Sequence, residues 1–363
     1  MALAVFVQHT TTLLVIPTPR VPRPLMASYG DLFPWLWNLN AVIYTFFVLS
    51  GYLIGRPFLR FLLDAGKRPD LLAYARNRAL RIVPAFLVAF VLTLVVFRPS
   101  SSAADLLSVP ALLGVPSPSL LDQYAGLYWS VHVEAVFYVG LGLAFLALAP
   151  LVRRPRAVRV AVLLALCVVV AGLSGADRLL GGQQAWNRQE FGQSLFGFVP
   201  GLVLALLEPL LVPRLRGLRW ARVIPIGLAL GCLAGYVILA VTGEERVLVR
   251  TGAYLLLSGG AVGGALTAQW LGRRPSRLLD RRPLHWLGER SYSFYLLHYL
   301  VLLLVAPLAV ATGHLTTGWA VMVGLGLPLT LALAAVSFRW LERPFLKRRP
   351  RPEPAGLTPA AYP

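Results

Sequence analysis

Long apolar runs dominate the sequence and constrain its fold more than any other feature. A transmembrane helix needs about 20 apolar residues, within a range of roughly 17–25. Ten runs come close to this length, at residues 2–16, 39–55, 82–97, 131–152, 158–174, 193–212, 223–241, 248–271, 292–311 and 319–340. The sequence therefore predicts an all-α integral membrane protein, a bundle of about ten transmembrane helices.

The overall composition supports this class. Hydrophobic residues make up 57% of the chain and charged residues 13%, whereas soluble domains average about 25% charged residues. The two cysteines, Cys167 and Cys232, each lie inside an apolar run, and no CxxC pair or His/Cys cluster has metal-ligand spacing. We predict neither a disulfide nor a metal site.

The net charge of +19 is unevenly distributed along the chain. If the N-terminus is cytoplasmic, 27 of the 34 Lys and Arg residues fall in the cytoplasmic loops and tail. Such an excess is typical of the cytoplasmic side of membrane proteins. We therefore predict that both termini are cytoplasmic. We expect a multi-pass protein of the cell membrane, located in a bacterial inner membrane. The charge indicates topology and contact with membrane lipids, and we expect no nucleic-acid partner.

The chain divides into two unequal parts. Residues 1–345 form the predicted membrane domain, and the basic, proline-rich residues 346–363 are expected to be a disordered cytoplasmic tail. The first apolar run is short and begins at Met1 without a basic segment before it, so it does not resemble a signal peptide. The short length and the missing flank leave open a natural start further upstream.

Two ionisable residues inside apolar runs are candidates for chemistry, because such residues are costly within a membrane. His9 lies in the first run, where a neutral imidazole can serve as a general base. Glu134 follows Ser130 by four residues, so the two share one helix face. The alternatives are structural, with His9 bonded to a neighbouring helix and Glu134 paired with a histidine or arginine across the bundle. His132 points roughly away from Glu134, and we predict that it lies at the water edge.

Arg78 and Arg81 lie three residues apart at the predicted cytoplasmic surface, shortly before Pro84. The spacing puts both side chains on the same side of a helix. Such a pair can hold a phosphate-bearing ligand. The alternative is a positively charged anchor that contacts anionic lipid.

A polar stripe runs along the ninth apolar run. Ser291, Tyr295 and His298 are spaced at i, i+4 and i+7, and therefore line one side of a helix. Polar stripes in apolar helices line cavities or helix contacts. We take Ser130, Tyr292, Tyr295 and His298 as candidate residues of a substrate cavity, with packing as the alternative for Ser291 and Tyr295.

Five segments, in this order, resemble the acyltransferase-3 family of integral membrane O-acyltransferases. They are FFVLSGYLIG (46–55), RNRALRIVP (76–84), YWSVHVEAVFYV (128–139), LGERSYSFYLLHYLV (287–301) and LERPF (341–345). Together they extend over nearly the whole chain. Five segments in this order are much more specific than any one of them alone.

In that family the first span carries an arginine, ten further residues and then a histidine that is the presumed catalytic residue. His9 is similar in position to that histidine, whereas the arginine would precede Met1 and is absent from this chain. Either the natural chain starts further upstream or the site has diverged. Glu134 is retained, and His132 replaces the serine that is common in the family.

The resemblance implies an enzyme, an acyltransferase that moves an acyl group from acyl-CoA to a hydroxyl. The acceptor would be a sugar, a cell-envelope glycan or a glycosylated small molecule such as a macrolide antibiotic. The implied site has acyl-CoA held near Arg78 and Arg81 as a co-substrate, with no tightly bound cofactor. His9 would take the hydroxyl proton, and Glu134 would orient His9 or balance its charge.

Two other functions remain open at this point: a transporter built on the same membrane fold, and an inactive scaffold. The predicted spans show no inverted repeat and no matching pair of broken helices, which are the sequence signs of many transporters. The missing arginine favours the scaffold. Acceptor-dependent release of CoA would distinguish the enzyme from both.

Overall fold

The computed structural model of the protein describes residues 1–16, 25, 35–36, 38–64, 66–98, 107, 109–110, 112, 128–180, 195–242, 247–272 and 281–347. Every regular element in these ranges is helical. Nearly all of the tail predicted for residues 346–363 lies outside the described residues.

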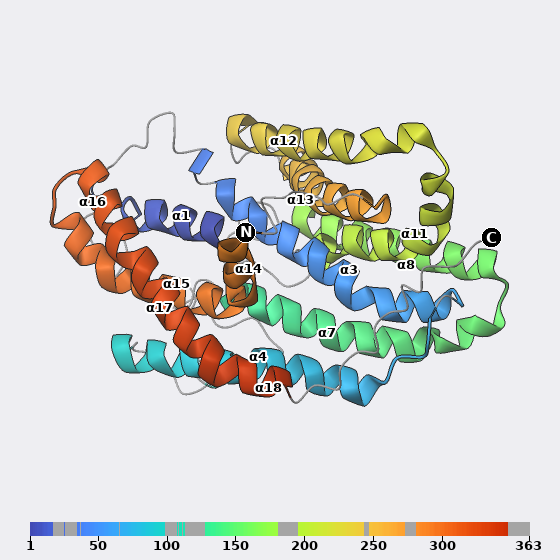
Figure 1. The fold of residues 1–363 in the computed structure, drawn as a ribbon, viewed down its shortest axis with the longest axis horizontal. Coiled ribbons are helices and arrows are strands. Elements are labelled where there is room, and N and C mark those ends of the chain that lie inside the picture. Colours follow the sequence, from blue (N-terminus) through green and yellow to red (C-terminus); the bar gives the residue numbers. More distant parts are fainter. Residues whose placement is uncertain are drawn as a thin grey trace.

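The helices follow one another along the chain as Figure 1 labels them. The first half contains α1 (Ala2–Leu13), η1 (Asn38–Ala41), α3 (Val42–Leu62), α4 (Leu71–Phe97), α7 (Tyr128–Leu148), η3 (Ala149–Arg153) and α8 (Arg156–Leu180). The second half contains η4 (Leu195–Phe198), α11 (Val199–Arg216), η5 (Arg219–Val223), α12 (Ile224–Thr242), α13 (Val247–Trp270), α14 (Arg282–Glu289), α15 (Ser291–Val310), α16 (Leu315–Val321), η6 (Met322–Gly326), α17 (Leu327–Ser337), η7 (Phe338–Glu342) and α18 (Arg343–Lys347).

Eight helical stretches in the described residues are long and apolar enough to cross a membrane. They correspond to eight of the ten predicted runs. The other two runs form α1, which has 12 residues, and α13, which has 24 residues and carries Arg250. Large apolar side chains project from several of these helices, as Ile226, Leu230 and Leu233 do from α12. An exposed apolar surface of this kind suits lipid, and the protein is a multi-pass membrane protein.

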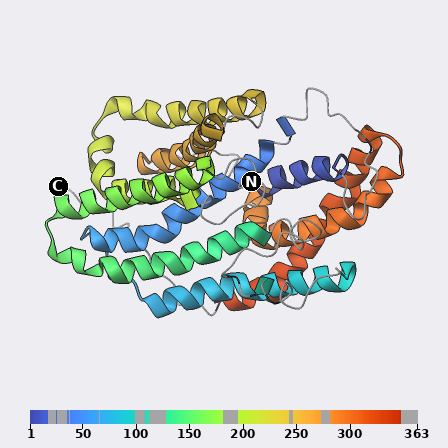
Figure 2. The same cartoon turned by 180° about the vertical axis from the view of Figure 1, so that it is seen from behind.

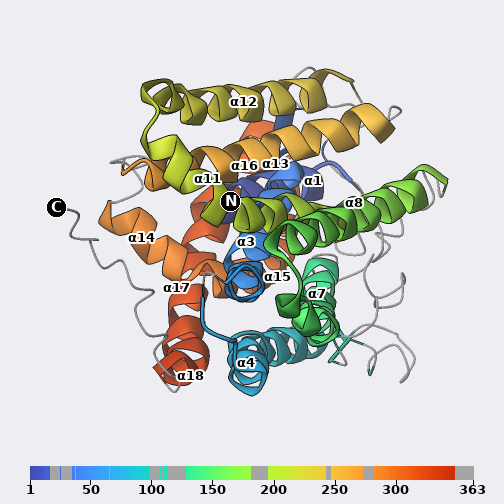
Figure 3. The ribbon, with the colours of Figure 1, turned by 90° about the vertical axis from the view of Figure 1, so that its right-hand side faces the viewer.

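Helix α3 runs through the middle of the bundle (Figures 1 and 3). Helices α11, α12 and α13 lie on one side of it, and α4 and α7 lie on the other. The view from behind shows α1, α15, α16 and α17 gathered at one end (Figure 2). Helix α1 contacts α15 and α3. The meeting place of α1, α3, α7 and α15 is therefore where the inner faces of several spans converge.

A partly buried ion pair joins α3 to α11. The Arg56 guanidinium donates two hydrogen bonds of 2.6 Å to the Glu208 carboxylate, and the Tyr52 hydroxyl donates a third at 3.0 Å. Buried carboxylates are tolerated in apolar surroundings when they are paired in this way. The partners of Glu208 give it a structural role.

Glycine allows α3 and α11 to approach closely. A methyl group on Gly201 would overlap the carbonyl oxygen of Val48 and would lie 2.6 Å from the backbone nitrogen of Tyr52. Small residues serve the same purpose in many membrane helix pairs, where close packing replaces the hydrophobic effect as the source of stability.

We expect Gly201→Ala to destabilise the protein by about 1–3 kcal/mol, the usual cost of overpacking a core. The measurement is thermal unfolding in detergent. Gly227→Ala in α12 is the matched control, because a methyl group there meets no atom within 4 Å. Equal unfolding temperatures for Gly201→Ala and the wild type would contradict the packing described here.

Candidate functional site

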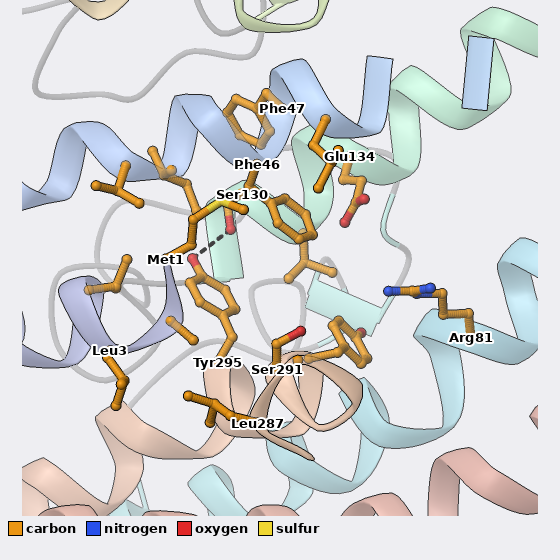
Figure 4. Close-up of a pocket in the computed structure, with 18 of the residues that line it drawn as sticks. Met1, Leu3, Phe46, Phe47, Arg81, Ser130, Glu134, Leu287, Ser291 and Tyr295 are labelled. Carbon is orange, nitrogen blue, oxygen red and sulfur yellow. Dashed lines mark hydrogen bonds between the residues drawn. The ribbon is translucent and has the colours of Figure 1, made fainter. Parts of the chain in front are cut away.

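A cavity of about 440 Å³ lies where α1, α3, α4, α7, α14 and α15 meet. Most of its wall is apolar, with polar groups concentrated on α4, α7 and α15 (Figure 4). The lining residues are Met1, Ala2, Leu3, Val5, Val42, Ile43, Phe46, Phe47, Leu49, Arg81, Ser130, Val131, Glu134, Leu284, Leu287, Gly288, Ser291, Tyr292 and Tyr295. A largely apolar cavity with a few converging polar groups is the usual form of a small-molecule site.

Glu134 extends from α7 into this cavity. Its Oε1 atom accepts a 3.1 Å hydrogen bond from the Ser50 hydroxyl of α3 and a short hydrogen bond from the Tyr138 hydroxyl. Its Oε2 atom accepts no hydrogen bond from the described residues. The two donors fix the orientation of the carboxylate at the edge of the cavity.

Two arginines of α4 lie near this carboxylate. The helix begins at Asp70, whose side chain accepts hydrogen bonds from the backbone nitrogens of Leu72 and Ala73 at 2.9 and 3.0 Å. Arg81 reaches toward the cavity from the side of Glu134 (Figure 4), and the two charges attract each other. Arg78 stacks over the Tyr138 ring, with its guanidinium carbon 5.5 Å from the ring centre, and is not a lining residue.

Hydroxyl groups connect the helices around the cavity. The Ser130 and Tyr295 oxygens are 2.6 Å apart, which joins α7 to α15. The Tyr292 hydroxyl donates to the carbonyl of Ile82 in α4 at 2.9 Å. Three of the four predicted cavity candidates, Ser130, Tyr292 and Tyr295, line the cavity together with Ser291, whereas the fourth, His298, does not.

A pair of histidines lies just beyond one end of the cavity. His9 Nδ1 is 2.9 Å from His298 Nε2, and the two rings are nearly parallel. His9 follows the lining residue Val5 by four positions on α1, and His298 follows Tyr295 by three on α15. At 1.5 Å per residue the pair is displaced about 5–6 Å along the helices from the lining side chains.

The hydrogen bonds determine where the protons of the neutral pair lie. His298 Nδ1 is 2.7 Å from the backbone oxygen of Tyr295, which can only accept, so His298 carries its proton on Nδ1. His298 Nε2 is then an acceptor, and His9 Nδ1 donates to it. His9 Nε2 consequently carries no proton and has no hydrogen-bond partner among the described residues. A half-buried, unprotonated imidazole nitrogen is the form that a general base requires.

The structure brings His9 together with His298 and not with Glu134. Within the described ranges no hydrogen bond or ion pair joins His9 to Glu134, and only the carboxylate lines the cavity. The sequence identified all three residues, but not which of them meet. Sequence reasoning missed the contact of Tyr138 with Glu134, although their i, i+4 spacing on one helix indicates it. Nothing in the sequence indicates the contact of Ser50 with Glu134, because Ser50 lies on another helix.

The prediction that His132 lies at the water edge is wrong. The side chain is fully buried, and its two ring nitrogens lie 2.8 and 2.9 Å from the backbone oxygens of Tyr128 and Val109. These contacts hold the ring against the backbone on the other side of α7 from the cavity. His132 is therefore a packing residue.

Comparison with protein families agrees with these features. The profile of the acyltransferase-3 family, described as an acyltransferase domain, matches residues 9–339. The chain belongs to the acyltransferase-3 family. The match begins at His9 and includes every candidate site residue named above.

Several bacterial O-acetyltransferases are similar to this chain. O-acetyltransferase OatA of Staphylococcus aureus is 25% identical over 337 residues, which cover 86% of this chain and 54% of the relative. Peptidoglycan O-acetyltransferase OatA of Listeria monocytogenes is 24% identical, covering 88% and 53%. The putative peptidoglycan O-acetyltransferase YrhL of Bacillus subtilis is 28% identical, covering 63% and 35%. The chain thus spans about half the length of the two OatA relatives. No solved structure matches it.

Proposed function

We propose that the protein is a membrane O-acyltransferase that transfers an acyl group from acyl-CoA to a hydroxyl group. The observation that carries the proposal is the His9–His298 pair, which leaves His9 Nε2 unprotonated next to a cavity of ligand size. The family match supports the reaction class. The names of the relatives support a hydroxyl acceptor on a cell-envelope glycan. A sugar or a glycosylated small molecule such as a macrolide offers the same chemistry.

In the proposed reaction, His9 Nε2 accepts the hydroxyl proton as the acceptor oxygen attacks the thioester carbonyl carbon. A carbon–oxygen bond forms, the carbon–sulfur bond breaks, and the leaving thiolate takes up a proton to give free CoA. General base catalysis of this kind contributes about 10²–10⁴-fold to the rate. His298 does not touch the substrates in this scheme, and it holds His9 in the reactive tautomer.

The proposed orientation places both termini in the cytoplasm of a bacterial cell, with the protein in the inner membrane. The distribution of basic residues supports this topology. The donor would then approach from the side of α14 and the arginines of α4. No cofactor needs to be bound permanently, because acyl-CoA is consumed in each turnover.

The experiment that tests this function is thiol release by the purified protein in detergent or nanodiscs. We expect release of CoA from acetyl-CoA that depends on a hydroxyl acceptor, offered as a panel of peptidoglycan fragments, sugars and macrolides. Binding of CoA without acceptor-dependent release would contradict the proposal, and would favour a transporter or an inactive scaffold.

We expect Glu134→Gln to lower kcat/KM for acyl transfer by about 10- to 100-fold, since a hydrogen bond to a charged group is worth about 1.5–3 kcal/mol. The amide oxygen of glutamine can still accept from Ser50 and Tyr138, so the change removes the charge that faces Arg81 and preserves the shape of the site.

The matched control for Glu134→Gln is Glu208→Gln, which alters the buried carboxylate between α3 and α11. This variant should lower the unfolding temperature through the loss of the Arg56 pair, with little change in kinetics per folded molecule. Full transfer activity in Glu134→Gln would mean that the charge at this position plays no part in acyl transfer.

A further inference from the structure

Gly288 lies at the edge of the cavity where it meets the outside. The residue lines the cavity and is itself exposed, whereas its neighbours Leu284 and Leu287 are half-buried. Residues 284, 287 and 288 have the i, i+3, i+4 spacing of one helix face, so this face of α14 points into the cavity. A side chain at position 288 would project into the same space.

Neither packing nor backbone geometry accounts for glycine at this position. A methyl group on Gly288 would meet no atom within 4 Å, in contrast to Gly51 and Gly201, where it would overlap backbone oxygens. Gly288 has ordinary helical geometry in α14, and glycine is unfavourable inside a helix. Its effect at this position is to leave an opening between α14 and the cavity.

The dimensions of the cavity suit one part of a CoA thioester. An apolar cavity of about 150 Å³ holds one benzene ring, and in proportion 440 Å³ holds about 18 non-hydrogen atoms. This is close to the size of a pantetheine arm, and it exceeds an acetyl group several-fold. The arm carries two amides, and Glu134 Oε2 and the Arg81 guanidinium offer an acceptor and a donor within the cavity.

The charge around the opening suits the rest of the same molecule. Arg281 and Arg282 are exposed at the start of α14, three and two residues before Leu284. Arginine binds phosphate groups strongly, because its planar group offers paired hydrogen-bond donors. The phosphate-bearing end of CoA would therefore remain at the surface while its arm enters beside Gly288.

We infer that the opening at Gly288 admits the pantetheine arm of the acyl donor, and that the size of residue 288 determines which donors reach His9. This inference rests on the proposed acyl-transfer function. A bulky side chain at residue 288 would obstruct a long arm that crosses the opening. A short thioester that lies entirely within the cavity would be obstructed much less.

The test compares Gly288→Phe with the wild type on two donors, acetyl-CoA and the truncated thioester S-acetyl-N-acetylcysteamine. We expect Gly288→Phe to raise KM for acetyl-CoA by about tenfold or more, with a smaller rise in Gly288→Ala and little change for the short donor. Gly227→Phe is the control, since position 227 also meets no atom within 4 Å and lines no part of this cavity.

An equal rise in KM for both donors, or an unchanged KM for acetyl-CoA, would overturn the inference. CoA binding tests the entrance independently of acyl transfer. It is measured by calorimetry on the wild type, Gly288→Phe and Gly227→Phe. Loss of CoA binding in Gly288→Phe alone would support the entrance even if no variant transferred an acyl group. Binding that is equal in all three proteins would contradict it.

Discussion

Replacing His9 with alanine should lower kcat/KM for acyl transfer by about 10²–10⁴-fold, the usual contribution of a general base. The residual rate would come from binding and positioning of the two substrates. The loss should fall on kcat, because His9 does not line the cavity that we assign to the donor. The measurement is acceptor-dependent thiol release over a range of acetyl-CoA concentrations.

The control for His9→Ala is His314→Ala, which removes an exposed histidine at the start of α16. It should retain wild-type kinetics. CoA binding by His9→Ala should also be retained, and would show that the variant is folded. If His9→Ala transferred acyl groups at the wild-type rate, the base would have to be another residue and the proposed mechanism would fail.

Replacing His298 should separate a positioning role from a catalytic one. His298→Ala removes the acceptor that fixes the proton of His9 on Nδ1. We expect kcat to fall by about 10- to 100-fold, because a hydrogen bond from the imidazolium formed when His9 takes the proton is worth about 1.5–3 kcal/mol. His298→Gln can present a carbonyl oxygen to the same Nδ1–H group, so it should recover part of the lost rate. KM for the donor should change little in both variants.

Two outcomes would contradict the positioning role of His298. Equal activity in His298→Ala and His298→Gln would mean that an acceptor at this place is irrelevant. A rise in KM without a fall in kcat would mean that His298 belongs to the donor site. The double variant with His9→Ala should be no slower than His9→Ala alone, because residues that act through one another are not additive.

Much of the fold could be predicted from the sequence, because the length of an apolar run is a local property. All ten predicted runs correspond to helices in the described residues, and eight meet the length and hydropathy expected of a membrane span. The limit of such reasoning is visible at α1 and α13. The sequence indicates apolar helices in both places, but α1 has only 12 residues, and α13, with 24 residues, is not among the eight.

The candidate site residues could be named from the sequence, since a histidine or a carboxylate in an apolar run is conspicuous. The pairing of these residues could not be predicted from the sequence, because it depends on which helices pack together. His9 meets His298 across α1 and α15, and Glu134 meets Ser50 across α7 and α3. His132 was misjudged for the same reason, since one of its two partners, Val109, belongs to a different part of the chain.

The His9–His298 contact has a consequence for the synthesis of the protein. The two residues are 289 positions apart, so the proposed base is synthesised well before the group that fixes its proton. A nascent chain can insert α1, α3, α4 and α7 into the membrane and still lack the reactive tautomer of His9. The enzyme would therefore become competent only late in translation, once α15 has joined α1.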